Sequence, residues 1–96
     1  MTRIRALVRG MSMWPTLREG EEHVFDPISI RHPGIGDVVL AEHPFRTGMI
    51  IIKRIKDRTE DGRWFLEGDN PDPTASEDSH AFGAVDPKLI LGTLAR

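Results

Sequence analysis

The chain has 96 residues, of which 39% are hydrophobic, and this size fits one folded domain spanning residues 1–96. Its 13 basic and 15 acidic residues, with a net charge of −2, exclude the strong positive field by which proteins attract nucleic acid or anionic lipid. The lack of cysteine excludes disulfides and thiolate chemistry, and no apolar stretch approaches the roughly 20 residues of a transmembrane segment. We therefore expect a soluble, cytoplasmic protein.

Short stretches of alternating apolar and polar residues predict a mainly β fold, because successive side chains of a strand point to opposite faces of a sheet. The predicted strands, in chain order, are 4–8, 22–25, 38–42, 49–55, 64–67 and 89–94. Turn-forming residues separate them, for example Glu19-Gly20 and Asp61-Gly62. Strands at this spacing predict a meandering or barrel-like sheet.

The regions outside the strands predict one helical turn and one long loop. Pro15 favours a helical turn over residues 15–18, since proline is common at the first helical position and Gly20 can end the turn. Residues 68–83 are rich in Asp, Pro, Ser and Thr and lack apolar periodicity, which predicts a loop.

Ser12 lies directly before the predicted turn and is a candidate nucleophile. A serine hydroxyl becomes reactive when a nearby base removes its proton, and backbone N–H groups at a helical start stabilise the resulting oxyanion. Taken alone, a serine before a helical turn is more often a cap or a loop residue. The neighbouring Met13, with Met11 and Trp14, is expected either to line a substrate groove or to pack in the core.

Lys53 is the candidate general base. On a strand over residues 49–55 it shares a face with Ile51 and Ile55, while Arg54 lies on the opposite face. One of the two cations must therefore lie beside apolar side chains. Burial of the lysine would lower its pKa and supply a neutral amine, which arginine cannot do. The alternative is a surface lysine within a basic cluster.

The histidines predict no metal site. They are widely separated along the chain and lack the i, i+4 spacing of metal ligands; they are His23, His32, His43 and His80. We expect no metal and no other cofactor.

Four motifs follow one another along the chain. They are Ser12-Met13-Trp14-Pro15-Thr16-Leu17, Gly36-Asp37-Val38-Val39, Lys53-Arg54-Ile55, and Gly68-Asp69-Asn70 continuing through Ser76, Asp78 and Ser79 to Gly83. In this order they resemble the motifs of the signal peptidase I (leader peptidase) family of serine/lysine peptidases over nearly the whole chain. The resemblance implies a catalytic core of short antiparallel strands with a helical turn after the nucleophile.

The resemblance also implies a role for each motif. Ser12 attacks the scissile carbonyl, neutral Lys53 takes its proton, and Ser76 hydrogen-bonds the lysine amine. Asp69 and Asp78 are implied to fix the last loop through salt bridges and turns.

Two positions depart from common members of the family. Gly10 stands where some members carry a hydroxyl oxyanion donor, which leaves the Ser12 backbone N–H in that role. His80 stands where an arginine commonly partners the loop aspartate, here Asp78.

The substrate is implied by a further resemblance. The chain has neither the transmembrane anchor nor the apolar membrane-dipping surface of membrane-bound leader peptidases. Its Leu66-Glu67-Gly68-Asp69-Asn70-Pro71 and Phe82-Gly83 resemble the compact maturation proteases of nickel-type superoxide dismutase. This implies a protein substrate, the nickel superoxide dismutase precursor, whose N-terminal leader is removed.

Three alternatives remain at this stage. One is a general signal peptidase-like enzyme that acts on secreted preproteins. Another is a self-cleaving repressor-type domain, although the 11 residues before Ser12 contain no Ala-Gly or Cys-Gly cleavage pair. The third is a binding module that keeps the fold without the activity, against which the joint presence of Ser12, Lys53 and Ser76 argues.

Overall fold

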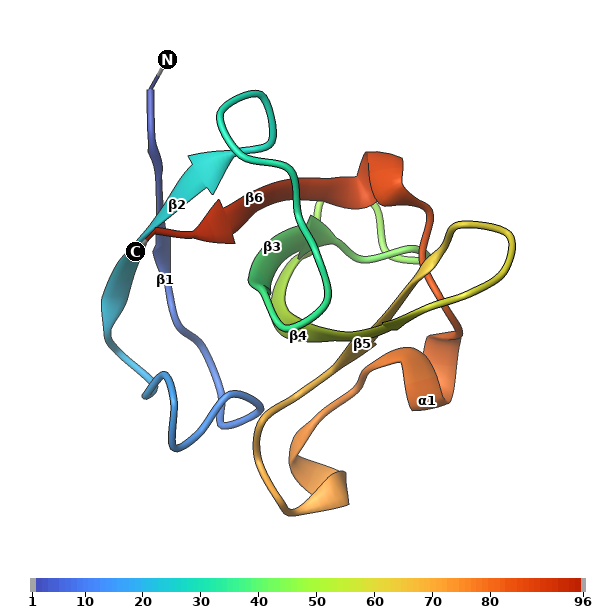
Figure 1. The fold of residues 1–96 in the computed structure, drawn as a ribbon. Coiled ribbons are helices and arrows are strands. Elements are labelled where there is room, and N and C mark those ends of the chain that lie inside the picture. Colours follow the sequence, from blue (N-terminus) through green and yellow to red (C-terminus); the bar gives the residue numbers. More distant parts are fainter. Residues whose placement is uncertain (1, 96) are drawn as a thin grey trace.

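The computed structural model describes residues 2–95, which form one six-stranded antiparallel sheet (Figure 1). The strands are β1 (Ile4–Leu7), β2 (Glu22–Pro27), β3 (Val38–Glu42), β4 (Ile50–Arg58), β5 (Trp64–Glu67) and β6 (Ile90–Leu94). They lie in the order β1-β2-β6-β3-β4-β5. The predicted mainly β class is confirmed, and each predicted stretch coincides with a strand. β4 is longer than predicted, continuing to Arg58.

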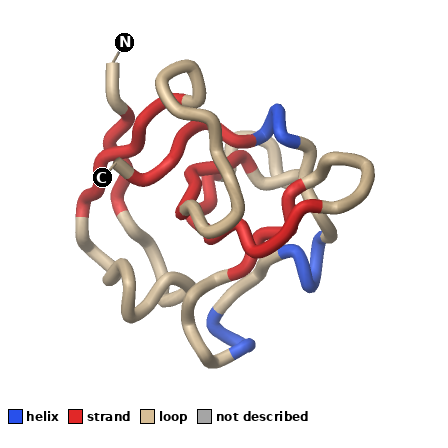
Figure 2. The backbone as a smooth tube through the Cα atoms, in the orientation of Figure 1, coloured by secondary structure: helices blue, strands red, loops and turns tan. Residues whose placement is uncertain are grey.

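The helical segments within residues 2–95 are all short (Figure 2). They are η1 (Pro73–Ala75), α1 (Ser79–Phe82) and η2 (Pro87–Leu89), and the first two lie in the segment predicted as a loop. The carboxylates of Asp72 and Asp78 cap them by accepting backbone N–H bonds. Helices of a single turn leave no apolar periodicity, which is why the sequence pattern missed them. None of the described helices has the length and apolarity to cross a membrane.

The segment after Ser12 is a series of hydrogen-bonded turns. One bond in it is of the helical type, from Leu17 N to Met13 O at 2.9 Å. That bond begins two residues before the turn expected from Pro15. The turn therefore follows the serine directly. Its first and last residues, Met13 and Leu17, both have buried side chains.

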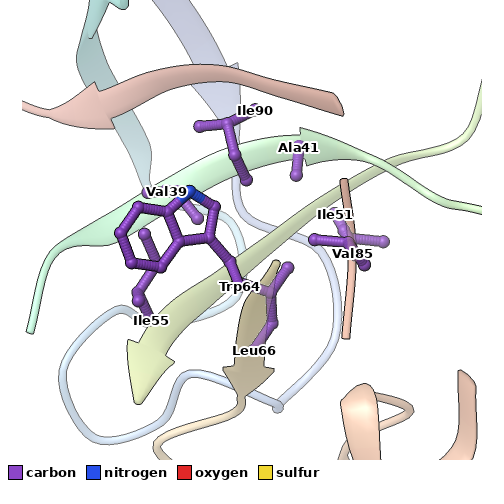
Figure 3. Packing of buried hydrophobic residues seen from close by; sticks show 8 residues of the cluster. All are labelled: Val39, Ala41, Ile51, Ile55, Trp64, Leu66, Val85 and Ile90. Atoms are coloured by element: carbon purple, nitrogen blue, oxygen red, sulfur yellow. The ribbon is translucent and has the colours of Figure 1, made fainter. Parts of the chain in front are cut away.

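The core consists of two hydrophobic clusters that share β3. Cluster A contains Val39, Ala41, Ile51, Ile55, Trp64, Leu66, Val85 and Ile90 (Figure 3). Cluster B contains Val8, Met13, Leu17, Phe25, Val38 and Leu40. Because alternate side chains of β3 enter different clusters, both faces of this strand are buried.

A groove runs between β1 and the first half of β4. It has a volume of about 730 Å³ and is lined by residues 4–9 and 48–53, with Leu40 and Leu91 also contributing. Both of its walls have an unpaired backbone edge within the described chain. β1 is the terminal strand of the sheet, and β5 pairs with β4 only at residues 54–58.

Candidate active site

Ser12 and Lys53 meet at one end of this groove. The Nζ atom of Lys53 donates a hydrogen bond to Oγ of Ser12 at 2.9 Å, although the two residues are 41 positions apart in the chain. Ser12 comes from the loop after β1, and Lys53 comes from β4, opposite Val39 of β3. The lysine is only 6% exposed. The alternative of a surface lysine is therefore excluded, and Arg54 is the more exposed cation of the pair.

Burial lowers the pKa of Lys53, since a low-dielectric environment disfavours the ammonium ion. The negative charges of Asp78 and Glu77 act in the opposite direction and raise it. The net effect is a pKa below the ordinary lysine value. A neutral amine can accept the hydroxyl proton across the same short contact.

The backbone around Ser12 is held by the segment after β5. The carbonyl of Ser12 accepts a hydrogen bond from the Asn70 backbone N–H at 2.9 Å, and the carbonyl of Met11 accepts one from the Asn70 side-chain amide at 2.8 Å. Gly68 packs so closely that an added Cβ would lie 2.6 Å from the Ser12 carbonyl oxygen and 2.6 Å from Ser76 Oγ. Only glycine fits this contact.

Asp69 ties the nucleophile turn to β4. Its carboxylate accepts two hydrogen bonds from the Arg54 guanidinium, at 2.8 and 2.7 Å, and one from the Thr16 hydroxyl at 2.6 Å. The remaining terminal nitrogen of Arg54 donates to the Gly36 carbonyl at 2.7 Å. Partial burial raises the pKa of Asp69, but the bonds from Arg54 and Thr16 outweigh it and hold that pKa below its ordinary value. The four sequence motifs thus converge on one network.

Asp78 organises the other side of the site. It accepts hydrogen bonds from the Gly68 backbone N–H at 3.1 Å and the Ser76 hydroxyl at 3.0 Å. Its second oxygen contacts Nδ1 of His80 at 2.8 Å, so this histidine is a further side-chain partner of the carboxylate. The expected bond from Ser76 to the Lys53 amine is not present among the described contacts. The Ser76 hydroxyl instead donates its hydrogen bond to the carboxylate of Asp78, a strong acceptor.

Gly10 and Met13 have structural explanations. Gly10 has φ of +74°, a left-handed conformation that favours glycine. This backbone requirement explains why glycine stands here, and no role in binding an oxyanion is needed. Met13 is 1% exposed and belongs to cluster B, so it packs in the core while also lining the groove. Within residues 2–95, the Ser12 backbone N–H has no acceptor. That donor remains available for an oxyanion.

A smaller pocket of about 210 Å³ lies against the same pair, and sequence reasoning missed it. Ser12 and Lys53 form part of its lining, together with His43, Arg46 and Glu77. The buried His43 accepts the Phe45 N–H at Nδ1, so Nε2 carries the proton and donates to Glu77 at 2.7 Å. Nothing in the sequence pattern links these positions, because His43 and Glu77 are 34 residues apart.

The described residues contain no group of three His, Asp or Glu side chains placed to hold a metal ion. No protein-family model matches the chain, and no curated protein sequence is significantly similar to it. The assignment of a function therefore rests on the side-chain geometry and on the resemblance of the four motifs.

Proposed function

We propose that the protein is a serine endopeptidase in which Ser12 is the nucleophile and Lys53 the general base. The observation that carries the proposal is the 2.9 Å contact between a buried lysine and a serine hydroxyl. A structural lysine at this depth is normally neutralised by a hydrogen-bonded carboxylate. The recorded partner here is a neutral hydroxyl, which compensates a buried charge poorly and suits a neutral amine.

The first half of the proposed reaction forms an acyl-enzyme. Neutral Lys53 removes the Ser12 hydroxyl proton as Oγ attacks the scissile carbonyl carbon, and the oxyanion is stabilised by the Ser12 N–H. The resulting lysine ammonium then donates its proton to the leaving nitrogen. The C–N bond breaks, the new amine departs, and the substrate acyl group remains as an ester on Ser12.

The second half restores the enzyme. A water molecule gives a proton to Lys53 and attacks the ester carbonyl, again through an oxyanion beside the Ser12 N–H. The C–O bond to Ser12 breaks, and its Oγ recovers the proton from the lysine ammonium. Lysine thus serves as base and acid in turn, as histidine does in other serine peptidases.

The groove supports an extended peptide as the substrate. Its walls present the unpaired backbone edges of β1 and residues 50–53 of β4, and such edges bind an added strand through main-chain hydrogen bonds. The exposed side chains of Leu7, Met49 and Ile50 line the groove, and their apolar surface favours apolar substrate residues. A leader segment in extended conformation meets both requirements.

For the substrate itself we propose the N-terminal leader of a cytoplasmic precursor, that of nickel-type superoxide dismutase. The motif resemblance described above supports this choice. Cleavage of a secretory preprotein instead would assign the general leader peptidase role.

The proposal is tested by incubating the purified protein with unprocessed nickel superoxide dismutase precursor and with a secretory preprotein, and sequencing the new N-terminus. Ser12→Ala and Lys53→Ala are each expected to lower kcat/KM by at least about 1,000-fold while remaining folded. The exposed residues Ser29 and Lys88 provide matched controls, and Ser29→Ala and Lys88→Ala should retain activity. Full activity of Ser12→Ala or of Lys53→Ala would exclude the mechanism.

A further inference from the structure

The three arginines at the start of the chain differ in their partners. Arg3 pairs with Asp26 at 3.0 Å and Arg5 with Glu22 at 3.6 Å, both across the β1–β2 pair. Arg9 is exposed, and no ion pair or hydrogen bond of its side chain occurs within residues 2–95. It lines both the groove and the small pocket beside Ser12. A guanidinium without a protein partner at this junction is available to a ligand.

The small pocket carries a positive charge when the enzyme is ready to react. Its charged lining consists of Arg9, Arg46 and Glu77, because the general base Lys53 is neutral at that stage. The Glu77 carboxylate is already engaged by His43 at 2.7 Å and by Arg46 at 3.4 Å. Two arginines and one glutamate leave a net charge of +1. Electrostatic complementarity therefore favours an anionic group in this pocket.

The pocket lies within reach of a residue near the scissile bond. The groove and the small pocket both include Ser12 and Lys53 in their lining, so these two residues lie where the groove and the pocket join. A compact volume of about 210 Å³ is roughly 7 Å across, and an extended chain rises about 3.3 Å per residue. The pocket therefore holds about two substrate residues next to the cleaved bond.

We propose that Arg9 makes the small pocket a subsite for a carboxylate side chain, an Asp or Glu of the substrate within about two residues of the scissile bond. The planar guanidinium fork binds both oxygens of a carboxylate, which gives selectivity over the isosteric amide. This inference rests on the proposed peptidase function, because the subsite is defined relative to the bond that Ser12 cleaves.

The test measures binding apart from cleavage. Fluorescein-labelled 14-residue peptides with apolar residues around a central Ala carry one Asp, scanned over four positions on each side, and each has a matched Asn peptide. Fluorescence anisotropy with the Ser12→Ala protein should show about fivefold tighter binding of Asp at one or two adjacent positions. The preference should shrink at high salt. Wild-type protein should cleave within about two residues of those positions.

Arg5 supplies the matched control, since it is also exposed and lines the groove but is paired with Glu22. In the Ser12→Ala background, Arg9→Gln should abolish the preference and Arg5→Gln should keep it. A preference that survives Arg9→Gln, or none at any position, overturns the subsite even if wild-type protein cleaves the peptides. An Arg9-dependent preference without cleavage of any peptide supports a carboxylate-binding site at Arg9 but counts against the peptidase function, and no binding of any peptide counts against both.

Discussion

The close approach of Gly68 to Ser12 predicts that a single added methyl group strongly lowers the proposed peptidase activity. In Gly68→Ala the new Cβ would lie 2.6 Å from the Ser12 carbonyl oxygen, whereas ordinary contact begins at 3.4 Å. The backbone at Ser12 or at Gly68 must therefore shift by the difference, about 0.8 Å. A misplacement near 1 Å lowers catalysis by about 100-fold, and overpacking of this kind lowers the free energy of unfolding by about 1–3 kcal/mol.

The assay compares kcat/KM on a cleaved leader peptide with the free energy of unfolding from urea denaturation. Gly92→Ala is the matched control, because a Cβ there would lie 2.7 Å from the Asp26 carbonyl oxygen, in the β2–β6 pair. Both variants should lose stability to a similar degree, but only Gly68→Ala should lose about 100-fold in kcat/KM. A folded Gly68→Ala protein within about threefold of wild-type activity would refute the positioning role derived from this contact.

Two further predictions concern charged groups. Asp69→Asn weakens the paired bonds to Arg54 and should lower the free energy of unfolding by about 1–2 kcal/mol and kcat/KM about tenfold, measured by urea denaturation and kinetics. Asp61→Asn, at an exposed ion pair, should change stability by less than about 0.5 kcal/mol, and equal losses in the two variants would contradict the role of Asp69 in tying the nucleophile turn to β4. For Lys53, whose pKa is lowered by burial, activity should rise with pH through a pKa below the ordinary value near 10.4, and a profile still climbing above about pH 10 contradicts a neutral base. The folded lysine binds fewer protons than the unfolded one between these two pKa values, so the free energy of unfolding should also rise with pH there, and Lys53→Met should remove that part of the dependence.

The strands followed from the sequence because they depend on a two-residue period, and the same period predicted that either Lys53 or Arg54 lies beside apolar side chains. Lys53 shares its face of β4 with Ile51 and Ile55, and all three are buried. Such alternation is local, so the residues that share a face of a strand can be predicted without knowing which strands lie beside it. The same reasoning does not say which face meets the serine, and that step came from the order of the motifs.

The parts that the sequence left unseen depend on contacts between distant segments. Gly68 looks like an ordinary turn glycine, and only the fold shows the carbonyl oxygen of Ser12 in the space of its missing Cβ. His43 looks like a surface histidine until Phe82 and Glu77 cover it. Ser76 was expected to contact Lys53, but its hydroxyl donates a hydrogen bond to the carboxylate of Asp78. Each outcome depends on which groups are in contact in the folded chain, and residue spacing in the sequence does not predict those contacts.

Under the proposed function, the division of the core around β3 ties catalysis to completion of the fold. Ser12 immediately precedes Met13 of cluster B, whereas Lys53 lies between Ile51 and Ile55 of cluster A. A nascent or partly unfolded chain that has formed one cluster alone holds one member of the pair without the other. Under the proposed function such a chain would not cleave peptides, and cleavage activity would report that both clusters have formed on β3.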